Sequence, residues 1–325
     1  MLYCFLATLR SVARANNSTD TASVPIYGMV AQNERQYHRI VNGRPIDHVS
    51  VPWHAAIYYN FGISPSYLCG ASIIGCNTLL TAGHCFANGL DPKQYKTAVG
   101  MSDTTQEVPL HHFKNVVRIT LHPMYKTVHG VPVHDVALVH VDYDLPVTSI
   151  VNLAPRGFND AYYTDLDMHV YGYGATHSGG GLTYPYILEG TVSGISNAKC
   201  INQYSSAFAS YATDAHSLSA ELIRDISLCA TATDEAGRIT DACQGDSGGA
   251  LVATNYGPVP MMPFLVGVVS WGYGCANAAY AGVYASVGAH LDFICEASGD
   301  SSIDMCESYK TTVEALSPFV PACLD

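Results

Sequence analysis

The amino-acid sequence predicts an all-β protein, an antiparallel sandwich or barrel, on two observations. Short runs rich in β-branched and aromatic residues recur along the chain, and turn residues separate them. The 325 residues include 28 Gly and 16 Pro, and only 13% are charged while 48% are hydrophobic, which excludes a disordered chain and a long coiled coil. Strands are expected within 55–59, 71–74, 78–80, 116–121, 136–141, 168–171, 265–269 and 282–284.

Helical patterns are few, and the best of them covers 287–297, near the end of the folded part. The three glycines at 179–181 predict a flexible loop. No Lys-Ser or Lys-Thr pair follows them and no switch from strand to helix surrounds them, so they do not form a phosphate-binding loop. Residues from about 298 to 325 have weak periodicity and are interpreted as a tail.

Charge and cysteine content limit the partners and the compartment. Fifteen Lys and Arg against 27 Asp and Glu leave a net charge of -12, which repels nucleic acids and anionic lipids. No apolar run reaches the roughly 18 residues that a membrane-spanning helix needs. The 11 cysteines include no Cys-x-x-Cys pair, which favours disulfides in an oxidising compartment. We therefore expect a secreted, extracellular protein with no nucleic-acid partner and no membrane span.

The amino terminus permits two interpretations. Residues 2–9 are apolar and Ala13-Arg14-Ala15 has the form of a signal-peptidase site, so residues 1–15 carry a weak signal-peptide pattern. Positive charge normally precedes the apolar part of a signal peptide, whereas Arg10 follows it here, so a truncated or misassigned start is the alternative.

Three separated segments contain side chains that could carry chemistry. Residues 79–85, Leu-Leu-Thr-Ala-Gly-His-Cys, bring His84 out of a β-rich run, although a lone histidine is more often structural than catalytic. Asp135 directly precedes an apolar run, where burial is costly unless a partner holds the carboxylate. Ser247 lies in the sequence Gly-Asp-Ser-Gly-Gly, whose glycines allow turns that point successive amides into one hollow.

Together these segments supply a general base, an orienting acid and a glycine-flanked nucleophile in the order His, Asp, Ser, as acyl transfer requires. With two further motifs, the set resembles the trypsin-like branch of the chymotrypsin-like serine proteases. The five matching motifs lie at 40–43 (Ile-Val-Asn-Gly), 81–85, 135–138, 245–249 and 270–272 (Ser-Trp-Gly). The resemblance runs from 40 to about 295 and implies two antiparallel β-barrels, with the active site between them and a short C-terminal helix.

The resemblance implies a role for each catalytic group. Ser247 is similar to the family's nucleophile, His84 to its general base and Asp135 to the acid that orients the imidazole. The backbone amides of Gly245 and Ser247 are similar to the oxyanion hole. Ser270 is expected to hydrogen-bond the buried carboxylate of Asp135.

The same resemblance implies a pocket for a cationic side chain. Asp241 stands six residues before the nucleophile, where trypsin-like members place the acid at the pocket floor. Gly272 and Gly282 match two wall positions that must stay small. Ala242 replaces a Ser found in many relatives, and losing that hydroxyl disfavours Lys more than Arg, because Arg can form a bidentate pair with the carboxylate.

The substrate main chain is expected to pair with Ser270, Trp271 and Gly272 as an added strand. The expected partners are proteins or peptides with Arg or Lys, and protein protease inhibitors are a candidate class. No cofactor and no metal are expected. Met101 replaces the first carboxylate of calcium-binding relatives, and no further ligand is spaced to join the adjacent histidines at 111–112.

The resemblance also implies three disulfides, each worth typically ~2–4 kcal/mol. They join Cys69 to Cys85, Cys200 to Cys229, and Cys243 to Cys275, of which the last frames the pocket. Five cysteines remain. Cys4 belongs to the leader, a bond between Cys306 and Cys323 is a reasonable expectation, and a bond between Cys76 and Cys295 is left open.

Some positions depart from the family pattern. Met168 and Ala253 stand where many relatives have two bonded cysteines, so both partners of that bond are lost together. Gly83 replaces the more usual Ala before the catalytic His, which predicts a looser backbone there. Tyr173 stands where a Trp is common.

Arg39-Ile40-Val41-Asn42-Gly43 resembles the family's activation junction. The resemblance implies that cleavage after Arg39 frees the amino group of Ile40, which folds inward and pairs with Asp246. We therefore expect a leader or propeptide at 1–39, a protease domain at 40–298 and a C-terminal tail at 299–325.

These features predict a serine endopeptidase that is secreted as a zymogen and cleaves after Arg and Lys through an acyl-enzyme. The alternative is a catalytically silent relative that binds a partner or inhibits another enzyme. Such relatives usually lack a triad residue, whereas all three triad residues and Gly245 are present here. A third interpretation, an adhesive or structural module, concerns only residues after about 298.

Overall fold

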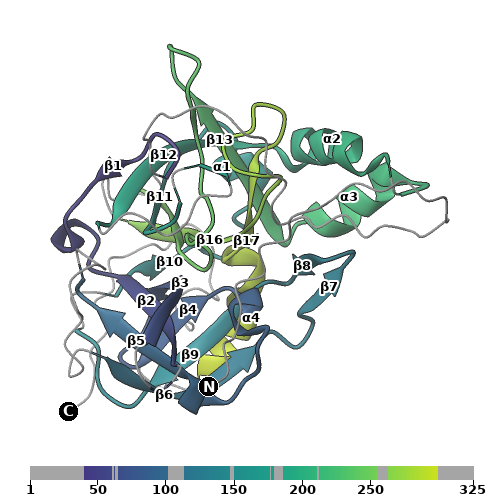
Figure 1. The fold of residues 1–325 in the computed structure, drawn as a ribbon. Helices are drawn as coiled ribbons and strands as arrows, with labels where there is room; N and C mark the ends of the chain where they lie inside the picture. Colours follow the sequence, from purple (N-terminus) through teal and green to yellow (C-terminus); the bar gives the residue numbers. More distant parts are fainter. Residues whose placement is uncertain are drawn as a thin grey trace, which may run out of the picture.

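A computed structural model of the protein contains two antiparallel β-barrels, one above the other (Figure 1). The structure describes residues 40–298 except 61, 63–64, 102–112, 147–149, 176, 179–185, 211 and 255–262. The expected leader and tail, Arg39, the glycine run at 179–181 and the histidines at 111–112 lie outside the described residues.

The first barrel closes through strands in the order β2-β3-β4-β9-β6-β5. Its central strands β4 and β9 are buried along their whole length, as expected for apolar runs that other segments cover on both faces. The strands are β2 (His54–Asn60), β3 (Pro65–Ile73), β4 (Thr78–Thr81), β5 (Tyr95–Val99), β6 (Lys114–Leu121) and β9 (Ala137–Val141).

The second barrel follows the order β12-β11-β15-β16-β17-β13 and closes where β12 pairs with β13. Its strands are β11 (Asp167–Gly172), β12 (Leu188–Ile195), β13 (Ser227–Thr233), β15 (Ala250–Ala253), β16 (Phe264–Trp271) and β17 (Gly282–Ser286). Short strands extend it, namely β1 (Arg44–Pro45), β10 (Asn152–Leu153) and β14 (Ile239–Thr240), while β7 (Lys126–Val128) and β8 (Val131–Val133) form a separate hairpin.

The two barrels share a packed core where they meet. One hydrophobic cluster joins first-barrel side chains such as Leu80 and Val139 to Leu265 of β16 and Ile294 of the last helix. A second cluster, which includes Ile40, fills the second barrel. Residues that face each other across this shared core are therefore held by both barrels.

The expected C-terminal helix is present as η6 (Gly288–His290) followed by α4 (Leu291–Ser298), which packs against β9 of the first barrel (Figure 1). The sequence analysis missed two other helices, α2 (Asn197–Phe208) and α3 (Ala215–Ile223), which lie beside the second barrel. The other helices in the described part of the chain are α1 (Asp160–Tyr163), η1 (His48–Ser50), η2 (Gly83–Phe86) and η3 (Pro92–Gln94). Among the described residues, no helix is long and apolar enough to cross a membrane.

Candidate active site

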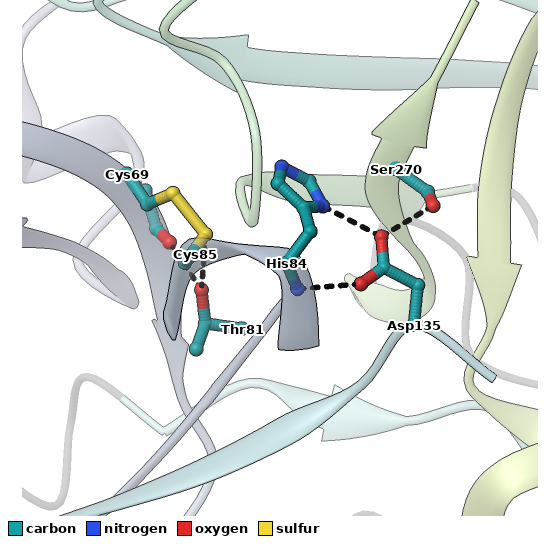
Figure 2. A network of polar contacts seen from close by, with 7 residues as sticks. Cys69, Thr81, His84, Cys85, Asp135 and Ser270 are labelled. Carbon is teal, nitrogen blue, oxygen red and sulfur yellow. Dashed lines mark hydrogen bonds and ion pairs between the residues drawn. A yellow bond between two sulfur atoms is a disulfide. The ribbon is translucent and has the colours of Figure 1, made fainter. Parts of the chain in front are cut away.

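His84 and Asp135 form a hydrogen-bonded pair at the end of the first barrel (Figure 2). The short helix η2 follows β4 and carries His84, whose Nδ1 lies 2.7 Å from Oδ2 of Asp135. The backbone amide of His84 donates to Oδ1 of the same carboxylate at 2.8 Å. Ser270, on β16 of the second barrel, donates its hydroxyl to Oδ2 at 2.5 Å. The expected bond between Ser270 and Asp135 is therefore present.

These contacts shift the pKa of both Asp135 and His84. Burial alone would raise the pKa of Asp135, but the His84 imidazole and the hydrogen bonds from His84 and Ser270 lower the pKa below its ordinary value. Burial lowers the pKa of His84, whereas the Asp135 carboxylate raises it more, so the net shift is upward. The pair can therefore stabilise an imidazolium, which a general base becomes after taking a proton.

Gly83 is explained by its neighbour Tyr125. A Cβ at residue 83 would lie 2.8 Å from Cδ2 of the Tyr125 ring, so the ring occupies the space that an alanine methyl needs. The backbone before His84 is thus packed against an aromatic ring, not loosened as the glycine suggests from sequence.

The loop that carries Ser247 is bonded to both barrels. The Ser247 carbonyl accepts from the amide of Gly70 on β3 at 2.8 Å. The amide of Gly248 donates to the carbonyl of Val269 at 2.9 Å, and Val269 donates back to Gly249 at 3.0 Å. Val269 directly precedes Ser270, the partner of Asp135, so these bonds hold the Ser247 loop beside the strand that reaches the His84–Asp135 pair.

Gly245 adopts a backbone conformation that favours glycine, with φ of 97°. Its carbonyl accepts the hydroxyl of Tyr67 at 2.8 Å, and the amide of Asp246 closes a turn onto the carbonyl of Cys243 at 2.9 Å. The peptides around Gly245 are therefore held from both sides. Sequence analysis missed Tyr67, which lies 178 residues away along the chain and carries no local motif.

A pocket lies beside the Ser247 loop. Asp241 is 5% exposed, and its Oδ2 accepts the amide of Ala276 at 2.9 Å, while Oδ1 has no hydrogen-bond partner among the described residues. A Cβ at Gly282 would lie 2.7 Å from this Oδ1, so a larger residue at 282 would cover the carboxylate. The predicted residues Asp241, Ser270, Trp271, Gly272 and Gly282 all line this pocket together with Ser247.

Burial raises the pKa of Asp241 to about 7, and the charge of Asp246 adds to the rise, although amides of Ala276 and Ala242 oppose it. An ionised, desolvated carboxylate with an unused oxygen is costly unless a cation approaches it. Tyr284, which the sequence analysis did not single out, also lines the pocket, and its buried hydroxyl has no hydrogen-bond partner among the described residues. The pocket therefore favours a cationic, hydrogen-bonding ligand group.

Ile40 and Asp246 are both fully buried in the structure. The chain after Ile40 is anchored by Val41, whose amide donates to the carbonyl of Asp241 at 3.1 Å. The Asp246 carboxylate accepts the amides of Gly174 and Cys243, each at 2.8 Å, and burial raises its pKa to about 7. A Cβ at Gly174 would lie 2.5 Å from this carboxylate, so the chain encloses it closely.

The three expected disulfides, Cys69–Cys85, Cys200–Cys229 and Cys243–Cys275, are present. Cys76 and Cys295 are also disulfide-bonded, and their pairing with each other stays a prediction. Met168 and Ala253 are register partners on β11 and β15, which fits the expected loss of one cross-strand disulfide.

Comparisons with known proteins agree with this arrangement. A family model described as Trypsin matches residues 40–294. Among curated proteins, Trypsin-1 of Astacus astacus is 32% identical over 231 residues, which cover 70% of this chain and 86% of that protein. The two barrels, the His84–Asp135 pair and these matches together show that the chain belongs to the trypsin family of serine proteases.

Proposed function

We propose that this protein is a secreted serine endopeptidase that cleaves peptide bonds after Arg, and less efficiently after Lys. The observation that carries the proposal is the buried Asp135, which binds His84 on one side and Ser270 on the other, beside the loop of Ser247. A carboxylate so placed orients an imidazole that can serve as a base. The alternative, a catalytically silent relative, is not favoured, because a protein that only binds a partner does not require a buried acid that orients His84.

In the proposed mechanism, Ser247 Oγ attacks the substrate carbonyl while His84 takes its proton. Asp135 holds the imidazole with Nδ1 toward the carboxylate and stabilises the imidazolium. The amides of Gly245 and Ser247 receive the negative charge of the tetrahedral intermediate. His84 then protonates the leaving amine, and a water activated in the same way hydrolyses the acyl-enzyme.

Substrate choice is proposed to rest on Asp241. Among the described residues its Oδ1 has no hydrogen-bond partner, and Gly282 has no side chain, so a long cation has a path to the carboxylate. Arginine can use two parallel hydrogen bonds there, whereas lysine depends more on neighbouring oxygens, and Ala242 supplies none from its side chain. Arg should therefore be cleaved better than Lys.

Activation by cleavage between Arg39 and Ile40 is supported by the burial of Ile40 and of the Asp246 carboxylate, which are both 0% exposed. A buried carboxylate is costly unless a cation pairs with it. Cutting the bond before Ile40 frees an amino group. The new ammonium group can then neutralise Asp246, as the family resemblance implies. Since Arg39 suits the Asp241 pocket, the mature enzyme can cut its own precursor.

Turnover of Arg, Lys and Phe reporter peptides tests the proposal. The full chain is assayed before and after activation, with and without a serine-directed covalent inhibitor, and the Ser247→Ala variant is the matched control. Activation-dependent cleavage in the order Arg, Lys, Phe that the inhibitor abolishes supports the proposal. Binding of substrate without turnover by the cut wild-type chain would favour the silent relative instead.

A further inference from the structure

Three histidines outside the proposed mechanism gather beside Asp135. His122 follows β6, His134 directly precedes Asp135, and His290 ends η6. Their metal-ligating nitrogen atoms all lie within 4.8 Å of one another. Sequence analysis expected no metal and did not consider these three histidines, which lie far apart along the chain.

His290 is oriented as metal-binding histidines are. It is 2% exposed, and its Nδ1 lies 2.6 Å from the carbonyl oxygen of Ser286. A carbonyl oxygen only accepts hydrogen bonds, so Nδ1 must carry the proton and Nε2 keeps its lone pair. Such a bond to a backbone carbonyl is the usual way in which a protein fixes the ring and tautomer of a metal ligand.

The lone pair of His290 meets a second histidine. Nε2 of His290 lies 3.2 Å from Nδ1 of His134. Bonds of about 2.0–2.1 Å to a tetrahedral Zn²⁺ hold two nitrogen ligands roughly 3.3 Å apart. In the metal-free protein Nδ1 of His134 therefore donates a hydrogen bond to Nε2 of His290. The same separation suits two ligands of one ion once the His134 proton moves to its other ring nitrogen.

His122 completes the group on the solvent side. Its ring stacks on that of His134, with centroids 4.8 Å apart and planes 4° from parallel, and it meets His290 edge-on at 5.1 Å. Its Nδ1 accepts the amide of Met124 at 3.1 Å, a partly exposed contact that is released if this nitrogen binds a metal. His122 and His134 are both half-buried, so an ion can enter from solvent.

The charges around the group permit a cation. The positive charges of Lys126 and Arg224 act on His134, but Lys126 pairs with Glu221 at 3.6 Å. The ionised Asp135 acts on His290 with the opposite sign.

We propose that His122, His134 and His290 form a binding site for one divalent transition metal ion of the kind that imidazole prefers, such as Zn²⁺. Three histidine ligands leave a fourth position for water. The site is separate from the proposed catalytic chemistry and does not depend on Ser247 acting as a nucleophile.

Zinc titration of the full, uncut chain tests the site. Isothermal calorimetry with Zn²⁺ alone should give one tight site per chain. His290→Gln and His122→Asn should each weaken that site by at least about tenfold, as loss of a ligand requires. His48→Gln, in helix η1, which contains no buried residue, is the matched control and should bind as wild type does. Thermal unfolding shows whether each variant is folded. If His290→Gln does not fold, His122→Asn still tests the site, because His122 is only half-buried.

Cobalt supplies a second readout. Co²⁺ bound by three imidazoles and water absorbs visible light much more strongly than free Co²⁺ does. This strong absorption band should vanish in His122→Asn. His84→Gln separates this site from binding at the catalytic histidine and should keep the tight Zn²⁺ site. Unchanged Zn²⁺ affinity in both cluster variants, no tight binding by wild type, or loss of the site in His84→Gln would each overturn the proposal.

Discussion

Replacing Asp246 by Asn should stabilise the folded chain before cleavage at Arg39–Ile40 and destabilise it after cleavage. In the uncut chain no ammonium group is available at Ile40, and the buried carboxylate has a pKa of about 7 against an ordinary value of 3.8. Its folded-state pKa is raised, so the protonated form is favoured by folding. The stabilising effect is full at pH below 3.8 and disappears as pH rises to about 7.

The size of the effect follows from that shift. A rise of roughly three pKa units corresponds to about 4 kcal/mol of unfolding free energy, lost by the time the carboxylate is ionised. Asparagine stays neutral, but its single oxygen can accept only one of the two amides that now bind separate carboxylate oxygens, those of Gly174 and Cys243. An unpaired buried amide costs about 1–3 kcal/mol. The net stabilisation of the uncut chain near pH 8 should thus be about 1–3 kcal/mol.

The cut chain should respond in the other direction. There the proposed activation pairs the Ile40 ammonium with Asp246, and removing one partner of a buried ion pair typically costs about 3–5 kcal/mol. Urea unfolding near pH 8 measures both forms, with Arg39→Gln holding the precursor uncut. The double variant should be more stable than Arg39→Gln alone, whereas cut Asp246→Asn should be less stable than cut wild type and inactive. Destabilisation of similar size in both forms would refute the reasoning, since Asp246 would then have its cationic partner before cleavage.

Four other changes test the proposed site. Ser247→Ala should remove nearly all peptide hydrolysis without lowering the melting temperature, because it deletes one hydroxyl and keeps the oxyanion amides; wild-type rates would exclude Ser247 as nucleophile. Asp241→Ser should lower kcat/KM for Arg peptides by several orders of magnitude and hardly affect slow cleavage after Phe, and equal losses would make Asp241 structural. Tyr67→Phe removes only the bond to the Gly245 carbonyl and should lower kcat roughly 2- to 10-fold with little change in KM, while a change confined to KM would argue against a positioning role. The rate should rise with pH through a midpoint above 6.5 as His84 loses its proton, because its pKa is raised; a flat profile speaks against His84 as the base.

The strands and the site motifs could be predicted from the sequence, because each is a pattern of neighbouring residues. Each strand run lies within or beside an observed strand, since short apolar segments between turns have few other ways to bury both faces. Where a residue's surroundings are set by its own segment, the sequence was enough.

The two missed helices contain a weak local signal. Ser196 and Asp214 accept amides of the first helical turns, and the buried side chains of α2 recur four residues apart, at Cys200, Tyr204 and Phe208. Small and polar residues between them hide this spacing. N-capping residues followed by such a stripe could have predicted both helices.

Contacts between distant segments could not be predicted in the same way. Nothing near Tyr67 in the sequence indicates Gly245, and nothing near Gly83 shows that the ring of Tyr125 fills the space beside it. The histidine group depends in the same way on three segments that are far apart in the sequence and close together in the fold. These features arise from tertiary packing, which overrides the expectation drawn from a single glycine or a lone histidine.

The distribution of the site over the two barrels explains why its residues are so far apart in the sequence. His84 and Asp135 come from the first barrel, whereas Ser270 and the Ser247 loop come from the second. Hydrogen bonds cross between them from Ser270 to Asp135, from Gly70 to Ser247 and from Tyr67 to Gly245. Each barrel is closed, so its loops start from rigid strand ends, and the shared core sets how the strand ends face each other. The carboxylate of Asp135 that binds His84 is therefore itself held by the barrel that carries Ser247, which couples the position of His84, the proposed base, to that of Ser247, the proposed nucleophile.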